Sequence, residues 1–156
     1  MSGPFAIQQQ SKIKVLTAPG ALVDGASLAV TELDTLGYEH CEIYLIIGTT
    51  NTACSAAILT EGDASGTGHG NIAASSFDGQ TNAVGATAVL PTAANDDSVF
   101  VWSLDLRKRK RYIDATITVG STSTGGYYTV IAILSNSKVM PVTEAERGDV
   151  ADWIRI

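Results

Sequence analysis

Several stretches of the chain alternate between apolar and polar residues, and this period of two constrains the fold more than any other feature. The clearest examples are residues 38–47, 98–106 and 112–119. Successive side chains of a β-strand point to opposite faces, so each stretch predicts a strand with one buried and one solvated face. Residues 127–134 are apolar on both faces, which is typical of a central strand in a sandwich. The sequence therefore predicts an all-β fold.

The spacing of these stretches favours a single domain built as an antiparallel β-sandwich or a jelly-roll-like barrel. No helical pattern of about a dozen residues separates the strands, which argues against a parallel α/β sheet. The 156 residues suffice for one compact domain with its own core. We expect an extended N-terminal arm at residues 1–11, the sandwich at 12–142 and a short C-terminal tail at 143–156.

The rest of the chain carries weaker strand signals. We expect further strands over residues 12–16 and 27–33, a hairpin turn at 48–51 that leads back through a partner strand over 53–60, and short strands near 72–77 and 83–90. The last two are expected because a structureless loop over residues 61–97 would be unusual in a compact domain.

The two cysteines, Cys41 and Cys54, fall near the start and the end of the expected hairpin. With its turn at residues 48–51 they do not face each other, whereas a disulfide needs Cα atoms within about 7 Å. We therefore expect two buried free thiols, which suits a reducing cytoplasm. Residues 1–5 lack the basic and apolar regions of a secretory signal, and no apolar run approaches the roughly 20 residues of a membrane span. We expect a protein kept in solution, with no membrane partner.

The charge of the chain is unevenly distributed. Its formal net charge is −6, which argues against general binding to nucleic acid. Residues 107–111 nevertheless hold five of the ten basic residues, so the remainder carries −11. One interpretation is a solvated turn that also discourages edge pairing of strands. The other is an electrostatic contact with an acidic neighbour, including another copy of the chain. The candidate partner-binding residues are Arg107, Lys108, Arg109, Lys110 and Arg111.

Catalytic and metal-binding patterns are not evident in the sequence. Its only histidines are His40, expected on the wet face of a strand, and His69, expected at a flexible loop tip. The glycine-rich residues 66–71 are not followed by the Gly-Lys-Ser/Thr of a phosphate-binding loop, and no Gly-x-Ser-x-Gly motif is present. Four scattered aspartates could bind calcium: Asp63, Asp78, Asp96 and Asp97. Aspartates in turns, however, usually bond to their own backbone. We expect no enzyme and no cofactor.

The sequence around residues 102–112 resembles a pattern in small proteins encoded among the head genes of tailed bacteriophages. In that pattern, aliphatic-Asp-Leu-Arg-x-Arg-Lys-Arg-Tyr leads into a strand, a glycine-rich turn, an apolar strand and a Pro-x-Thr-x-x-Glu-Arg-Gly tail. Here the basic motif is residues 104–112 and the strand after it is 113–119. The glycine-rich turn is 120–126, the apolar strand is 127–134 and the tail is 141–148. The likeness covers about the last third of the chain and is weaker over residues 36–60, whereas residues 61–97 depart from the pattern.

Some of these proteins resemble capsid decoration, or cement, proteins, and the likeness implies what this chain could bind. It implies a virion protein on the capsid exterior, made in the host cytoplasm, that binds the major capsid protein and stabilises contacts between its subunits. A homotrimer and no nucleic-acid partner are expected. Phe5 and Ile7 in the arm and Trp153 in the tail join the basic run as candidate contacts. The alternative is a carbohydrate- or receptor-binding sandwich displayed on the virion, with a tyrosine platform made of Tyr38, Tyr44, Tyr127 and Tyr128.

Overall fold

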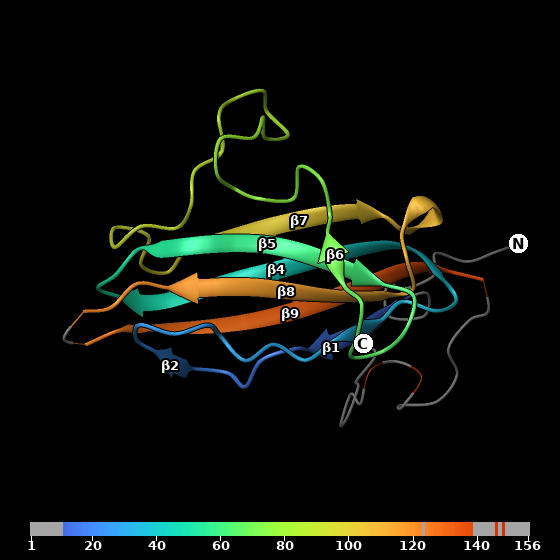
Figure 1. The fold of residues 1–156 in the computed structure, drawn as a ribbon, viewed down its shortest axis with the longest axis horizontal. Coiled ribbons are helices and arrows are strands. Elements are labelled where there is room, and N and C mark those ends of the chain that lie inside the picture. The colour runs from blue at the N-terminus through green and yellow to red at the C-terminus, as the bar shows by residue number, and fades with distance from the viewer. Residues whose placement is uncertain (1–10, 123, 139–145, 147, 149–156) are drawn as a thin grey trace, which may run out of the picture.

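The computed structural model describes residues 11–122, 124–138, 146 and 148, and it forms two packed antiparallel sheets (Figure 1). The elements are β1 (Lys12–Val15), β2 (Ala21–Val23), β3 (Leu33–Asp34), β4 (Tyr38–Thr50), β5 (Cys54–Gly62), β6 (Gly70–Asn71), β7 (Val99–Asp105), the 3-10 turn η2 (Leu106–Lys108), β8 (Tyr112–Val119) and β9 (Gly126–Ser137). Sheet A has the order β1-β9-β4-β7, with β2 also paired to β9, and sheet B has the order β3-β8-β5-β6. The predicted all-β sandwich is confirmed.

The core lies between the sheets and is made by every second residue of the long strands. From Cys41 to Ile47 of β4 the inward side chains are exposed by at most 1%, and β8 and β9 show the same alternation. The largest fully buried side chains include Ile43, Leu45, Ile47, Ile113, Ile117, Tyr128, Val130 and Leu134. Burying each such aliphatic side chain contributes about 1.5–3 kcal/mol. The period of two in the sequence thus identifies the core positions.

The expected hairpin between β4 and β5 is wrong, because the two strands belong to different sheets. Residues 51–53 carry the chain from sheet A to sheet B, where β5 pairs with β8 instead. The chain crosses back between β8 and β9 beside them, where the Gly120 N–H donates to the Ala53 carbonyl and the Asn51 N–H to the Gly125 carbonyl. There a Cβ on Gly120 would lie 2.9 Å from Thr52 Oγ1 and 3.0 Å from the Ala53 carbonyl oxygen, so the close approach favours glycine. Alternation shows which face of a strand is buried but not which strand lies beside it.

The cysteines are separated by this arrangement, since Cys41 lies in sheet A and Cys54 in sheet B. Both are buried free thiols, as expected. Burial raises the pKa of Cys41 to about 12, so its thiol stays protonated at neutral pH.

Three of the weaker predicted strands are wrong. In the stretch 27–33 only the first and last residues pair with another strand. Ser27 forms an isolated bridge to Thr118, and Leu33 begins β3. The stretches 72–77 and 83–90 consist of turns, bends and irregular segments, and the second contains an isolated bridge from Thr87 to Thr81. In the second, the Asn82 side chain accepts the backbone N–H groups of Val84 and Ala86 and so satisfies locally what a strand would need from a neighbour.

One further observation concerns the start of the described chain. Ser11, which the sequence places in the flexible arm, is buried next to the start of β1.

No helix in the described part of the chain is long and apolar enough to cross a membrane.

Candidate functional site

The basic run begins at the end of β7, where Asp105 shapes the turn η2. The Asp105 carboxylate accepts the Arg107 backbone N–H at 3.1 Å and so caps the turn, while Leu106 is buried in the core. The same carboxylate accepts two hydrogen bonds from the Arg107 guanidinium, at 2.8 and 2.6 Å. These bonds hold the pKa of the Asp105 carboxyl well below its usual range. Arg107 therefore has an intramolecular partner two residues away.

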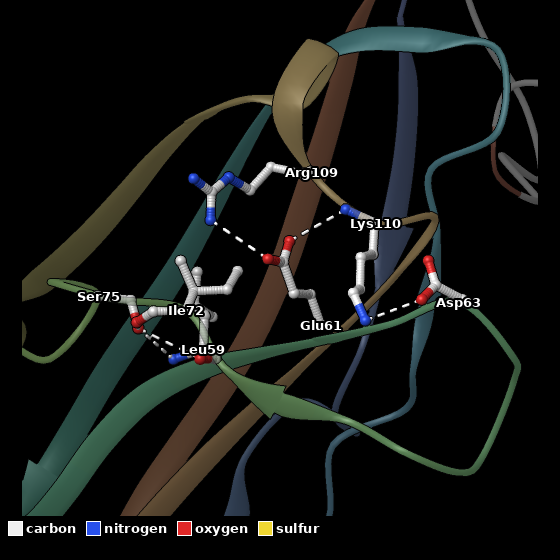
Figure 2. Close-up of polar contacts among 7 residues, drawn as sticks. All are labelled: Leu59, Glu61, Asp63, Ile72, Ser75, Arg109 and Lys110. Atoms are coloured by element: carbon white, nitrogen blue, oxygen red, sulfur yellow. Dashed lines mark hydrogen bonds and ion pairs between the residues drawn. The ribbon is translucent and has the colours of Figure 1, made fainter.

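Arg109 and Lys110 are linked to the end of β5 (Figure 2). Arg109 Nη1 lies 3.4 Å from Glu61 Oε1, and the Lys110 backbone N–H donates to Glu61 Oε2 at 3.0 Å. The Lys110 ammonium lies 2.8 Å from Asp63 Oδ2. Asp63 is thus an ion-pair partner, and these contacts hold the turn against sheet B.

Arg111 connects β8 to β3 at the edge of sheet B. Its guanidinium donates to both carboxylate oxygens of Asp34, at 2.8 and 2.7 Å. This pair lowers the pKa of the Asp34 carboxyl. The Thr35 hydroxyl donates to the Arg111 carbonyl at 2.7 Å, and the guanidinium lies 4.9 Å from the centre of the Tyr112 ring.

Four of the five basic residues in the run therefore have an acidic partner within the chain, and Lys108 makes no ion pair with a described residue. These pairs are solvent-exposed, so they add little to stability, but they fix the direction of each side chain. The charge that the turn offers to a partner is concentrated at Lys108.

A pocket of about 290 Å³ lies beside this turn, at the open edge of the sandwich. Its apolar lining includes Leu59, Ile72, Trp102 and Leu104, and Lys108 and Arg109 line it next to the turn. Of its lining residues, none is a histidine, and the one carboxylate, Asp105, is already bonded to Arg107. The lining therefore offers a shallow apolar contact beside positive charge rather than a general acid and base.

Ser75 organises the wall of this pocket, a role that the sequence analysis missed. Its hydroxyl accepts the Leu59 N–H at 3.0 Å and lies 2.8 Å from the Ile72 carbonyl oxygen (Figure 2). The Ser75 carbonyl accepts the indole N–H of Trp102 at 2.6 Å, and Phe77 packs on the same indole. A serine among many small residues carries no sequence signal for this role.

His69 is not a flexible loop tip but is packed against the body of the protein. Its Nε2 atom lies 2.9 Å from Glu32 Oε2, an ion-pair distance without the geometry of a hydrogen bond. Glu32 also accepts the Ser65 hydroxyl at 2.6 Å and the Gly66 N–H at 2.9 Å, and these bonds lower the pKa of its carboxyl. The His69 ring fills the space over Gly62, where a Cβ would overlap it.

Two of the other candidate ligands, His40 and Asp96, also have hydrogen-bond partners. His40 lies on the outward side of sheet A and bonds to the hydroxyls of Ser135 and Ser103 at 3.2 and 3.1 Å. Asp96 accepts the Thr50 N–H at 2.7 Å. Within the described ranges, no group of three or more His, Cys, Asp or Glu residues could hold a metal ion.

The outward side of sheet A, hereafter the outer face, is unusually apolar. The strand registers place Val15, Ile131, Tyr44 and Val101 opposite one another in one row across β1, β9, β4 and β7. The large exposed side chains of this face are Ile13, Val15, Leu22, Val99, Val101 and Tyr127. Contiguous exposed apolar surface of this kind is typical of an interaction site.

A platform of four solvent-facing tyrosines does not form. Tyr44 and Tyr127 lie on the outer face, but Tyr128 points into the core with 1% of its surface exposed. Its hydroxyl bonds to Thr50 Oγ1 at 2.9 Å. Tyr38 is half-buried at the start of β4. This contradicts the condition on which a glycan-binding interpretation depends.

The remaining sequence candidates, Phe5, Ile7 and Trp153, lie outside the described residues. Comparisons with family models, curated proteins and solved structures found no match to the chain.

Proposed function

We propose that the chain is a structural protein of a tailed-phage head, a decoration or cement protein that binds the capsid exterior and stabilises contacts between major capsid subunits. The sequence likeness over residues 102–148 supports this proposal and implies a homotrimer. The likeness carries no catalytic motif, and intramolecular ion pairs hold most of the basic run in place, which supports a role in binding. The protein acts by binding and not by chemistry.

The observation that carries the proposal is the outer face of sheet A. Four strands at about 4.8 Å spacing and seven residues along β9 at about 3.3 Å each give a face of roughly 19 Å by 23 Å. A sheet face of this size matches another protein better than a small molecule, which needs a concave site. Its apolar row through Val15 and Ile131 would be desolvated on a capsid subunit.

The basic turn supplies the charged part of the proposed contact. Ion pairs with Glu61, Asp63 and Asp34 hold its basic residues other than Arg107 and Lys108 in fixed positions, and Lys108 is available to an acidic surface. Lys108 is the last residue of η2, the turn that directly follows β7, so its charge lies near the end of this strand of sheet A. Electrostatic attraction would then guide the approach, and the apolar face would provide the contact area.

The test uses heads of the phage that encodes the chain, purified without their decoration protein. Val15→Lys places a charge within the outer face, whereas Val84→Lys makes the same change in a loop where the side chain is 87% exposed. Co-sedimentation with the heads should be lost for Val15→Lys and retained for Val84→Lys and the unaltered protein. Absence of binding by the unaltered protein, or equal binding by both variants, would refute the proposal.

A further inference from the structure

The strand β7 has an open edge, because it is the last strand of sheet A and pairs only with β4. The Ile47 N–H donates to the Ser98 carbonyl at 2.9 Å, and this bond shows which residues near β7 direct their backbone groups towards β4. Backbone groups alternate in direction along a strand, so those of Val99, Val101 and Ser103 point away from β4. They have no hydrogen-bond partner in the part of the chain that the structure describes.

This edge lacks the features that usually prevent pairing. From Val99 to Leu104 the strand contains no proline and no charged residue, and its register with β4 is unbroken. The outward side chains of Val99 and Val101 are 54% and 42% exposed. At the opposite margin of the sheet, Gly148 packs directly on the Ile13 carbonyl of β1. Sheet A is therefore open to another strand at β7.

The neighbouring loop does not fill the position of another strand. Ser75 bonds to the Trp102 indole, and Phe77 packs on the Phe100 and Trp102 rings, with ring centres 5.3 and 4.6 Å apart. Trp102 points into the core, so these contacts place the segment on the core side of β7. The pocket beside Ser103 also leaves space at the C-terminal half of the edge.

The two ends of β7 carry opposite charges without partners. Asp97 precedes the strand and Lys108 follows it, both are exposed, and neither makes an ion pair or hydrogen bond through its side chain with a described residue. Two antiparallel copies of β7 would bring the Asp97 end of each next to the Lys108 end of the other. A parallel arrangement would place like charges together.

We propose that β7 is a self-association edge, at which two copies of the chain pair their β7 strands antiparallel about a two-fold axis and extend sheet A into one continuous sheet. Such a contact is isologous, so each copy contributes the same residues and the assembly closes. Main-chain bonds from Val99, Val101 and Ser103 provide the attachment, and the Asp97 and Lys108 pairs fix the direction. The inference does not rest on the proposed function. If the chain also forms trimers through other surfaces, the same β7 contact would join those trimers in pairs.

Light scattering coupled to size exclusion tests the proposal on the full chain at physiological salt. The unaltered protein should have an even multiple of 16.2 kDa, and Val101→Pro should halve that mass. Proline removes the outward N–H of Val101 but no bond to β4, so the fold is kept. Val101→Thr keeps the N–H and should keep the mass. An odd multiple or a single copy in the unaltered protein, or a mass that the proline leaves unchanged, overturns the proposal.

Charge reversal supplies a test that does not depend on tolerance of proline. Lys108→Glu should weaken self-association about ten-fold, because two symmetric pairs are lost and each exposed pair contributes modestly. Lys12→Glu makes the same change on β1, at the other edge of sheet A. Equal weakening by both variants overturns the antiparallel arrangement. Hydrogen exchange provides a further check, since the Val101 amide should become protected as protein concentration rises.

Discussion

Replacing Ser75 with alanine should destabilise the protein by about 1–3 kcal/mol, because the hydroxyl serves two buried backbone groups. In the folded protein Ser75 is 9% exposed, and its side chain accepts the Leu59 N–H and contacts the Ile72 carbonyl. Alanine leaves that N–H without its partner in a place that water does not easily reach. The Leu59 carbonyl keeps the Ile72 N–H and the Ile72 carbonyl keeps the Ser75 N–H, so only the Leu59 N–H loses its partner altogether.

Urea unfolding followed by circular dichroism measures this loss as a shift of the midpoint at unchanged slope. For a chain of this size the same loss corresponds to a melting temperature lower by roughly 2–12 °C. Ser76→Ala is the matched control, because among the described residues the Ser76 hydroxyl bonds only to the exposed Asp78 N–H. It should change stability by less than about 0.5 kcal/mol. Equal stability of the two variants would show that Ser75 is not the hydrogen-bonding centre described above.

Two further predictions concern stability. Gly62→Ala should destabilise the protein by about 1–3 kcal/mol, because the added Cβ displaces the His69 ring. Gly70→Ala is the control, since no atom lies within 4 Å of the Cβ that it adds. Thermal melts measure both changes, and failure of an added His69→Ala to recover the stability lost in Gly62→Ala would contradict this explanation. Arg111 lowers the folded-state pKa of Asp34 below its usual 3.8, so this pair stabilises the protein above that pH and the stabilisation disappears as pH falls through the lowered value. The difference in melting temperature between the unaltered protein and Asp34→Asn should therefore shrink on acidification, and a difference independent of pH would argue against the pair.

The long strands were predictable because the core needs apolar residues on one side only. The alternation in β4, β7 and β8 gave each strand and its buried face. The pairing of strands was not predictable, since β5 has a suitable face for either sheet and the short connection at residues 51–53 resembles a hairpin turn. The prediction for the loop over residues 72–98 was wrong because side chains such as those of Ser75 and Asn82 bond to its backbone groups, at the Ile72 carbonyl and the Ala86 N–H.

For the candidate site, the sequence located the basic turn but not its partners. Arg109 and Arg111 pair with carboxylates 48 and 77 residues earlier in the chain. No local pattern links residues so far apart, because the two sheets bring them together only in the folded state. The outer face could have been noticed at β1 and β9, where Val15 and Ile131 are apolar at outward positions.

The crossings between the sheets have a consequence for how the chain folds. From β4 onward the long strands alternate between sheets, as β4 in A, β5 in B, β7 in A, β8 in B and β9 in A. Neither sheet can be completed by a contiguous piece of the chain, so both must mature together, and the β4 pairing with β9 waits until residues 126–137 have been synthesised. Nonlocal pairing of this kind slows folding. Co-translational intermediates would expose unpaired edges of β4, and the yield of native protein should depend on completing β9.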